Sequence, residues 1–428
     1  MERKQTKISL QKALLICLMV LVIIFLIEIA LTPKTIENET IPQIQNEIED
    51  KSTKDIDNTD FSTVFLKIEN NKKNTIYSPL SIKYALKMLE EGANGDTKTQ
   101  INDVIGDVNL TKYDSLDKVL SFANAVYIRD TYSSFVKDSY KNSVMQKYDA
   151  EIKYDEFKNA KNVNTWIENK TLGIIKNMLK DNIVQNPNTE MLLINALAID
   201  MEWENRFQDK DTQGADFYLE NGNTMNATTM HQETSSNNIS YYKDNKLTAL
   251  SMDLKKYGDR QLEFIAIMPN DNLSEYVKTF DVNELNNITK KLIKASETKN
   301  GLNIYIPKFS FNYDLKLKND LIKLGITDAF DEILADFSNM SNRELFASDA
   351  LHKANIDFTE KGVKASAVTV IIMMDKAMIM ETNRPEEVKI DKPFVFVIRD
   401  KDTDEIWFIG TVYEPNSWEK DKIEYVYR

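Results

Sequence analysis

The chain has 428 residues, of which 42% are hydrophobic and 10% aromatic, a composition that supports a sizeable globular core. Acidic residues outnumber basic ones by 67 to 54, and the net charge of -13 comes with no long basic block, which argues against DNA or RNA binding. With only two histidines, His231 and His352, and the single Cys17, a zinc cluster of histidine and cysteine ligands is excluded beyond the N-terminal segment. We therefore expect no metal and no cofactor.

The N-terminus has the pattern of a membrane anchor. Four basic side chains in residues 1–12 precede an apolar run, residues 13–31, which only Glu28 interrupts. This run is close to the length of about 20 residues that spans a bilayer. A cleaved signal peptide would have a shorter apolar region followed by a small-x-small site. We therefore expect an uncleaved signal-anchor helix, with residues 1–12 in the cytoplasm and the rest of the chain outside.

The remaining chain divides into three parts. Residues 32–60 are polar and acidic, with no sustained hydrophobic period, and are expected to form a flexible stalk. A globular domain follows over residues 61–415, and residues 416–428 form a short charged tail. Because Cys17 lies within the expected anchor, the exported part contains no cysteine and no disulfide.

A buried helix is predicted at the start of the globular domain. Ser78 is a suitable N-cap, Pro79 suits the first helical position, and Gly92 marks the end. The apolar side chains between them fall on one face, at Ile82, Ala85, Leu86 and Leu89.

Strand-like runs dominate the second half of the chain. They occupy residues 191–200, 262–269, 302–309, 394–400 and 406–415. Helices dominate the first half. This order predicts an α+β fold with large, mostly antiparallel sheets.

Several stretches in this chain resemble the serpins, a family of serine protease inhibitors. They stand in the family's order over residues 74–415 and read NTIYSPLSIKYALKML, FANAVYI, LLINALAIDMEWENRF, IPKFSF, LIKLGITDAF, ADFS, HKANIDFTEKGVKASAVT, DKPFVFVIRD and FIGTVYEP. The resemblance implies the serpin fold, in which helices and large β-sheets carry an exposed reactive-centre loop. It also implies a monomeric inhibitor that is not an enzyme.

The stretch TEKGVKASAVTVIIMMDKAMIM, residues 359–380, resembles the serpin hinge and loop. In inhibitory serpins this loop inserts after cleavage as a new central strand, so alternate side chains must fit a packed interior. Odd positions from Val363 to Met373 are all small or apolar, whereas even positions begin polar and finish apolar. An ordinary buried strand is the alternative. The implied hinge residues are Glu360, Gly362, Val363, Ala365, Ser366, Ala367 and Thr369.

The resemblance also implies a position for the scissile bond. Counting the family's spacing from Glu360 places it at Lys376-Ala377, where Lys376 would fill the acidic specificity pocket of a trypsin-like protease. The segment that follows is longer than usual in the family. Cleavage at Met374, Met378 or Arg384 therefore remains an alternative.

Three further groups of residues match family positions. Ser78, Ser81, Asn195 and His352 resemble the shutter, a set of polar groups beneath the sheet that must rearrange when it opens. Trp203 resembles the breach tryptophan at the insertion point, although Asp200 and Met201 replace the usual Lys-Gly pair. Lys308 and Glu360 resemble a pair that tethers the hinge, worth about 0–1 kcal/mol if exposed.

These features predict a suicide inhibitor of a trypsin-like serine protease, carried on the outer face of the cell membrane by residues 13–31, or secreted if that segment is cleaved. A second hypothesis is a non-inhibitory serpin-fold surface protein that proteases cleave as a substrate. A third, an exported hydrolase using His231 or His352, is disfavoured because the chain has no G-x-S-x-G nucleophile elbow.

Overall fold

The computed structural model describes residues 60–106, 110, 112–363 and 384–418. Within this part of the chain, no helix is both long and apolar enough to cross a membrane. The predicted anchor, residues 13–31, lies outside the described residues, as does the stalk up to residue 59. So do several predicted loop residues, namely Ala365, Ser366, Ala367, Thr369, Lys376 and Ala377.

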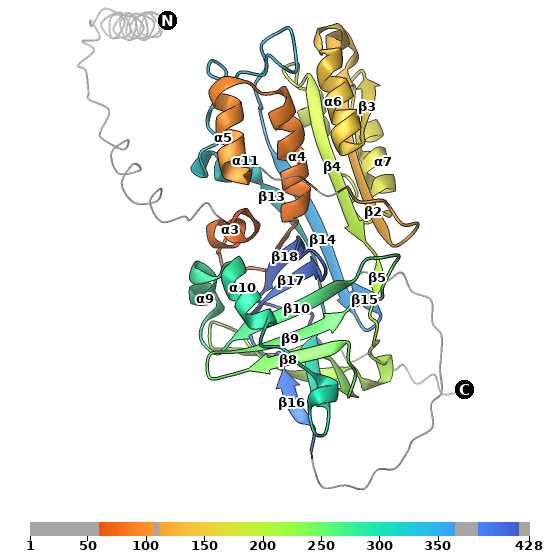
Figure 1. The fold of residues 1–428 in the computed structure, drawn as a ribbon, viewed down its shortest axis with the longest axis vertical. Coiled ribbons are helices and arrows are strands. Elements are labelled where there is room, and N and C mark those ends of the chain that lie inside the picture. The colour runs from red at the N-terminus through yellow and green to blue at the C-terminus, as the bar shows by residue number, and fades with distance from the viewer. Residues whose placement is uncertain (1–59, 107–109, 111, 364–383, 419–428) are drawn as a thin grey trace, which may run out of the picture. The chain divides into compact units, whose positions relative to one another are not determined.

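Helices labelled as in Figure 1 occupy mainly the first half of the described chain. The α-helices are α3 (Phe61–Ile68), α4 (Pro79–Gly92), α5 (Gly95–Ile105), α6 (Asp138–Tyr148), α7 (Lys161–Lys170), α8 (Asp181–Val184), α9 (Leu273–Thr279), α10 (Val282–Thr289) and α11 (Leu317–Lys323). Short 3-10 helices are η1 (Asp130–Phe135), η2 (Asp209–Asp211), η3 (Ala295–Glu297) and η4 (Asp328–Phe330).

The strands of the described residues form four sheets. A seven-stranded sheet has the order β1 (Thr75–Tyr77), β18 (Ile406–Val412), β17 (Phe394–Asp400), β10 (Leu262–Pro269), β9 (Leu247–Asp253), β8 (Ile239–Lys243) and β11 (Ile293–Lys294). A four-stranded sheet contains β16 (Glu386–Lys389), β12 (Leu302–Pro307), β7 (Thr224–Thr234) and β6 (Gln213–Tyr218). Another contains β13 (Phe309–Lys316), β14 (Leu351–Thr359), β15 (Gly362–Val363) and β5 (Met201–Glu202). The fourth contains β3 (Ala150–Asp155), β2 (Leu120–Arg129) and β4 (Met191–Ile199).

The predicted fold class is confirmed. Within the described residues, parallel pairing occurs between β2 and β3 and between β12 and β16, and the other strand pairs are antiparallel. The helix predicted from residue 79 is also confirmed as α4, because the Ser78 side chain accepts a hydrogen bond from the Ser81 N–H at 3.1 Å and caps it.

One predicted strand is wrong in extent. The run over residues 302–309 forms two strands in different sheets, because Lys308 separates β12 from β13. The N–H of Lys308 donates to the carbonyl oxygen of Thr228 at 2.8 Å, which anchors the chain where it leaves one sheet for the next. Apolar patterning continues across this point, so periodicity alone did not reveal the change of sheet. Likewise, the last predicted strand ends at Val412 and does not reach Pro415.

Strands β1, β18, β17, β10 and β9 of the seven-stranded sheet are buried on both faces. On β10, Ile265 and Ile267 enter one hydrophobic core, whereas Phe264 and Ala266 on the opposite face enter a second core that also contains Trp203. Side chains of a strand alternate between faces, so burial of both faces requires the continuous apolar runs seen in β10 and β17.

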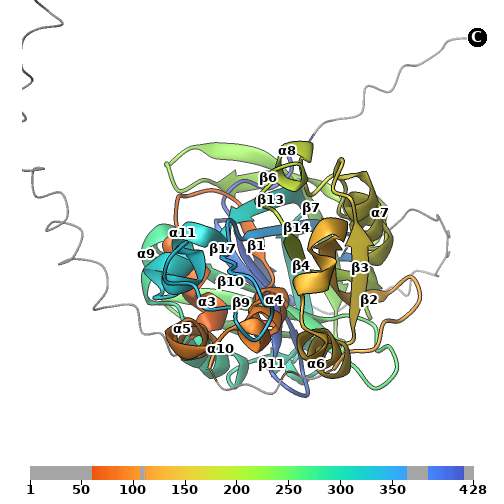
Figure 2. The same ribbon diagram turned by 90° about the horizontal axis from the view of Figure 1, so that it is seen from above.

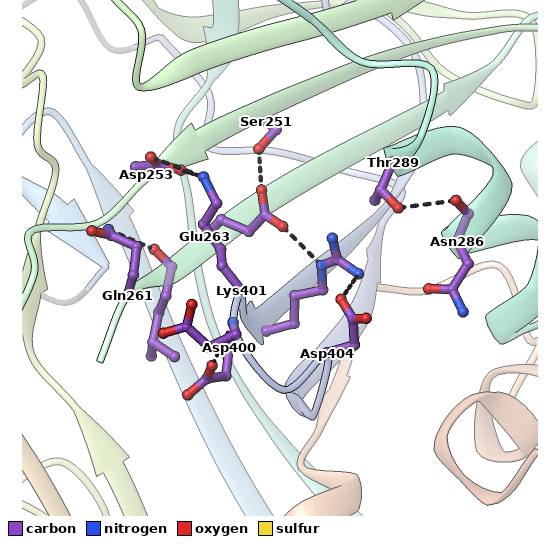
Figure 3. Close-up of polar contacts among 12 residues, drawn as sticks. Ser251, Asp253, Gln261, Glu263, Asn286, Thr289, Asp400, Lys401 and Asp404 are labelled. Carbon is purple, nitrogen blue, oxygen red and sulfur yellow. Dashed lines mark hydrogen bonds and ion pairs between the residues drawn. The ribbon is translucent and has the colours of Figure 1, made fainter. Parts of the chain in front are cut away.

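A group of hydrogen-bonded charged side chains lies at one end of this sheet (Figure 3). Glu263 on β10 lies directly opposite Arg399 on β17, and the two side chains form an ion pair at 2.8 Å. The hydroxyl of Ser251 donates to Glu263 at 2.6 Å, and Arg399 also pairs with Asp404 at 2.8 Å. Glu263 and Arg399 are 4% and 7% exposed, so the buried charge of Glu263 depends on Arg399 for compensation.

Two half-sheets lie beside each other at the centre of the described domain (Figures 1 and 2). One ends at β4 and the other contains β14, and within the described residues β4 pairs only with β2. Chain continuity joins them at one end, where β4 leads through Asp200 into β5, and β5 pairs with β15. Helix α7 packs against β2 and β4 through Val163, Trp166 and Ile167, which form a third core with Ile194 and Ala196.

Candidate functional site

The site begins at β15, a strand of two residues between the half-sheets. On one side, Gly362 and Val363 pair with Thr359 and Phe358 of β14. On the other side, Gly362 pairs with Glu202 of β5, and Val363 pairs with Met201 of the same strand. Val363 is 3% exposed and belongs to the same core as Trp203. The first predicted loop residues are therefore already part of the sheet.

Gly362 is required by a close approach of two backbones. A Cβ atom at this position would overlap the carbonyl oxygen of Met201 in β5. Gly362 was predicted from the sequence as a residue of the loop hinge. In the structure, its missing side chain lets β15 pair with β5.

Trp203 lies beside this strand and is fixed by two hydrogen bonds. Its backbone N–H donates to the carbonyl oxygen of Lys361 at 2.9 Å, and its indole Nε1–H donates to that of Thr359 at 2.8 Å. The ring packs edge-on against Phe358 and Phe264, with centroid distances of 5.2 and 5.9 Å. Trp203, the predicted breach residue, thus fixes the turn between β14 and β15 through two hydrogen bonds.

Glu360, at the turn itself, is held by a cation and a hydroxyl. Lys308 Nζ lies 2.8 Å from its carboxylate, and Thr212 Oγ1 donates to it at 2.7 Å. Burial alone would raise the pKa of Glu360, but the hydrogen bonds from Lys308 and Thr212 outweigh it and lower the pKa below its usual value. Side-chain exposures of 24% and 9% show that the Lys308–Glu360 pair is largely buried. Thr212 was not identified from the sequence.

A slot separates β4 from β14 next to β15. One cavity of about 240 Å³ is lined by Leu193 and Asn195 of β4 and by Leu351 and His352 of β14, among others. A smaller cavity of about 20 Å³ is lined by Val363 and by residues of the same two strands. The larger volume greatly exceeds the 10–15 Å³ or so that one water molecule needs. The described residues therefore leave room between the half-sheets for additional side chains.

The predicted shutter residues form one polar network beneath the slot. The Ser78 N–H donates to His352 Nε2 at 3.0 Å, and the Ser81 hydroxyl donates to Asn195 Oδ1. Asn195 in turn donates to Asn124 Oδ1 of β2 at 2.8 Å. The N-terminus of α4 therefore connects β14 to β4, two strands that do not pair with each other in the described structure.

Asn124 is a member of this network that sequence reasoning missed. It is 2% exposed and its Nδ2 donates to the carbonyl oxygen of Tyr148 at 2.7 Å, at the end of α6. The signal was present, since Asn124 is the polar residue in the apolar FANAVYI run. A buried amide in such a strand needs hydrogen-bond partners.

Neither histidine is arranged for nucleophilic catalysis. Burial lowers the pKa of His352 to about 4, so its ring is neutral and accepts the Ser78 N–H. His231 lies on β7, stacks on Tyr305 at a centroid distance of 4.5 Å and contacts Asn303 Oδ1 at 2.6 Å. Among the described residues, neither ring is hydrogen-bonded to a serine hydroxyl or a carboxylate, and no cluster of potential metal ligands occurs.

The structure thus brings together Glu360, Gly362 and Val363 with Trp203 and Lys308 at one end of the slot. The shutter residues lie beneath its middle. The predicted scissile bond is not among the described residues.

Comparison with known proteins gives the family. Residues 57–415 match the serpin (serine protease inhibitor) family. Leukocyte elastase inhibitor of Equus caballus is 30% identical over 370 residues, covering 80% of this chain and 93% of the horse protein.

Solved structures agree with this match. The thermophilic serpin tengpin in its native state has a TM-score of 0.70 and 29% identity, covering 83% of this chain and 93% of tengpin. Thyroxine-binding globulin in complex with thyroxine has a TM-score of 0.70 and 26% identity, covering 84% of this chain and 98% of the globulin. The chain therefore belongs to the serpins, whose inhibitory members are protease inhibitors and not enzymes.

Proposed function

We propose that this protein is a suicide inhibitor of trypsin-like serine proteases, which it traps as a covalent acyl complex. The observation that carries the proposal is the position of β15 between β14 and β5, at the open end of the slot. In this proposal, cleavage after Lys376 frees the loop, and the loop continues β15 into the slot as a new strand. The attached protease is carried along before water can release it.

The pairing of β15 gives the expected register of the inserted strand. Extending it along β14 places Ala365 opposite Ile356, and extending it along β5 and β4 places the same residue opposite Ile199. Both neighbours are buried in the core that contains Val363. The two registers therefore agree that odd-numbered loop positions face inward, which suits their small or apolar side chains.

The same register brings the loop into contact with the shutter. Thr369 would lie opposite His352 of β14 and opposite Asn195 of β4. These are two residues that the α4 N-terminus now connects through Ser78 and Ser81. A threonine hydroxyl can take a place in that hydrogen-bond network as the strands separate around it.

The register also accounts for the apolar even positions in the second half of the loop. Val368 and Val370 would lie beside Ala196 and Ile194 of β4, whose side chains are covered by α7. Outward-facing residues at this height meet helix α7 and not water, so apolar side chains suit them. Lys364 would lie between Asp200 and Asp357, beyond this covered zone, which fits its charge.

Insertion supplies enough free energy for the trap. About a dozen new ladder hydrogen bonds at about 1 kcal/mol each contribute on the order of 10 kcal/mol. This is comparable with the whole stability of an ordinary domain, about 5 to 15 kcal/mol. The uncleaved protein is then a kinetically trapped state whose lifetime depends on the barrier to insertion.

We further propose that residues 13–31 anchor the protein in the cell membrane with the serpin domain outside. The basic residues before this run and its length support that orientation. The protein would then act on proteases that reach the surface of the producing cell.

Incubation with trypsin followed by denaturing electrophoresis tests the function. A covalent band at the summed mass is expected for the wild type, and Lys376→Ala should abolish it. Arg384→Ala is the matched control, because it removes another basic residue of the same segment. A wild-type protein that yields only nicked chain would refute the inhibitory function. Loss of the complex in Arg384→Ala alone would move the reactive bond to Arg384.

The same experiment addresses the non-inhibitory alternative. This alternative draws support from the similarity to thyroxine-binding globulin, a structure solved with thyroxine bound. Lys361, Val363 and Lys364 also depart from the residues usual in the hinge of inhibitory serpins. Rapid cleavage without complex formation is the outcome that this alternative predicts.

A further inference from the structure

The chain immediately after the family match forms a joint between three segments. Asn416 follows the matched residues 57–415, and its N–H donates to the carbonyl oxygen of Lys308 at 2.9 Å. Its own carbonyl oxygen accepts from the N–H of Thr228 at 2.8 Å, and its side-chain Oδ1 accepts from the N–H of Ser310 at 3.1 Å. Asn416, which follows β18, therefore connects its own segment to β7 and to the junction between β12 and β13.

The next residues extend this contact along the edge of β7. Ser417 forms an antiparallel bridge with Ala227, and the N–H of Trp418 donates to the carbonyl oxygen of Asn226 at 2.9 Å. The Trp418 ring lies against Gly214 of β6, at a point where a Cβ atom would not fit. Residues 416–418 thus occupy the place beside β7 that β12 vacates after its last residue. We call these three residues the brace.

The brace acts on the residue that tethers the hinge. Both backbone polar groups of Lys308 are hydrogen-bonded. Its N–H donates to the carbonyl oxygen of Thr228, and its carbonyl oxygen accepts from the N–H of Asn416. Its side chain reaches the Glu360 carboxylate at 2.8 Å. Since the position of the Lys308 backbone determines where the ammonium group can reach, a loosened carbonyl group weakens the contact with Glu360.

We propose that Asn416 is a positioning residue for the hinge, and that the brace holds β15 in its native place through Lys308 and Glu360 until the loop is cut. This role rests on the proposed inhibitory function, because a controlled hinge matters only if the loop inserts. In the absence of the brace, β15 should leave and re-enter the sheet more often. The partition between trapping and release of the protease should shift as a result.

Two truncated chains provide a matched comparison. A chain ending at Trp418 loses residues 419–428 and keeps the brace, whereas a chain ending at Pro415 loses both. The readout is hydrogen exchange of the backbone amides of residues 360–363 in the uncleaved protein. We expect exchange about fivefold faster in the chain ending at Pro415, the change produced by loss of about one net hydrogen bond. Equal exchange in the two chains would overturn the proposal.

A double-mutant cycle separates this role from general stabilisation. In a Lys308→Met background the truncation should no longer accelerate exchange at the hinge, because the link to Glu360 is already lost. An undiminished fivefold effect would show that the brace does not act through Lys308, which would also overturn the proposal. Glu360→Gln provides the same test where Lys308→Met does not fold. The exchange readout does not require inhibition, so a wild type that fails to trap trypsin refutes the proposed function separately.

Discussion

Ala367→Arg tests the proposed insertion most directly. Extending the register of β15 places Ala367 between Ala354 of β14 and Leu197 of β4, which are 2% and 6% exposed. An arginine there must enter a packed apolar site with no acidic partner among these neighbours. The penalty for such a buried charge is at least about 3 kcal/mol. If half of it is present in the transition state, insertion slows by about tenfold, since 1.4 kcal/mol corresponds to a factor of ten.

The assay measures how many molecules of inhibitor are consumed for each molecule of active-site-titrated trypsin that is trapped. This ratio equals one plus the hydrolysis rate divided by the insertion rate. Slower insertion in Ala367→Arg should therefore raise its excess over one about tenfold, and nicked chain should accumulate. Ser366→Arg is the matched control, because the same register turns it to the opposite face, between the half-buried Asn355 of β14 and Ala198 of β4, so we expect a smaller loss of trapping than for Ala367→Arg. Equal trapping by Ala367→Arg and the wild type would refute the register. So would a Ser366→Arg variant that is equally impaired.

Three further predictions concern stability. Chain nicked after Lys376 should unfold at least about 10 °C above intact chain in thermal scans, because insertion adds on the order of 10 kcal/mol; equal unfolding temperatures would contradict insertion. The pKa of His352, about 4, lies below the usual histidine value, so its stabilising effect is complete above pH 6.5 and is lost as pH falls toward 4. The loss is at most about 3 kcal/mol, and urea unfolding of His352→Gln should lack this slope relative to wild type. Arg399→Met leaves Glu263 unpaired in the core and should cost about 3–5 kcal/mol, measured by the same urea titration; a change below about 1 kcal/mol would contradict it.

Local chemistry made much of the fold predictable. Helix α4 was predictable because Ser78, Pro79 and its apolar face are signals contained within one segment. Strands β10 and β17 were predicted with their observed bounds, because burial on both faces leaves a continuous apolar run. The break at Lys308 was missed because a change of sheet alters hydrogen-bond partners without altering the apolar pattern.

The candidate site was only partly predictable for a related reason. Trp203, Glu360 and Lys308 were identified through family motifs, and the structure places them in contact with the hinge. Thr212 donates one hydrogen bond to Glu360, and Asn416 donates one to Lys308. Both residues come from segments far away in the sequence, and nothing in their neighbours distinguishes them. The separation of β4 from β14 depends on strand pairing across the whole domain, which local patterns do not encode.

The two paired residues of β15 affect the rate of the proposed insertion. A free strand entering a gap must first find its alignment, and an error of one residue would turn every side chain to the wrong side. In the proposed function this alignment is set before any protease arrives, because Gly362 and Val363 already pair with β14 and β5. The proposed insertion can then proceed residue by residue from β15, because each newly paired residue places the next one. The proposed insertion therefore needs no search for its register, which favours it over hydrolysis of the acyl-enzyme.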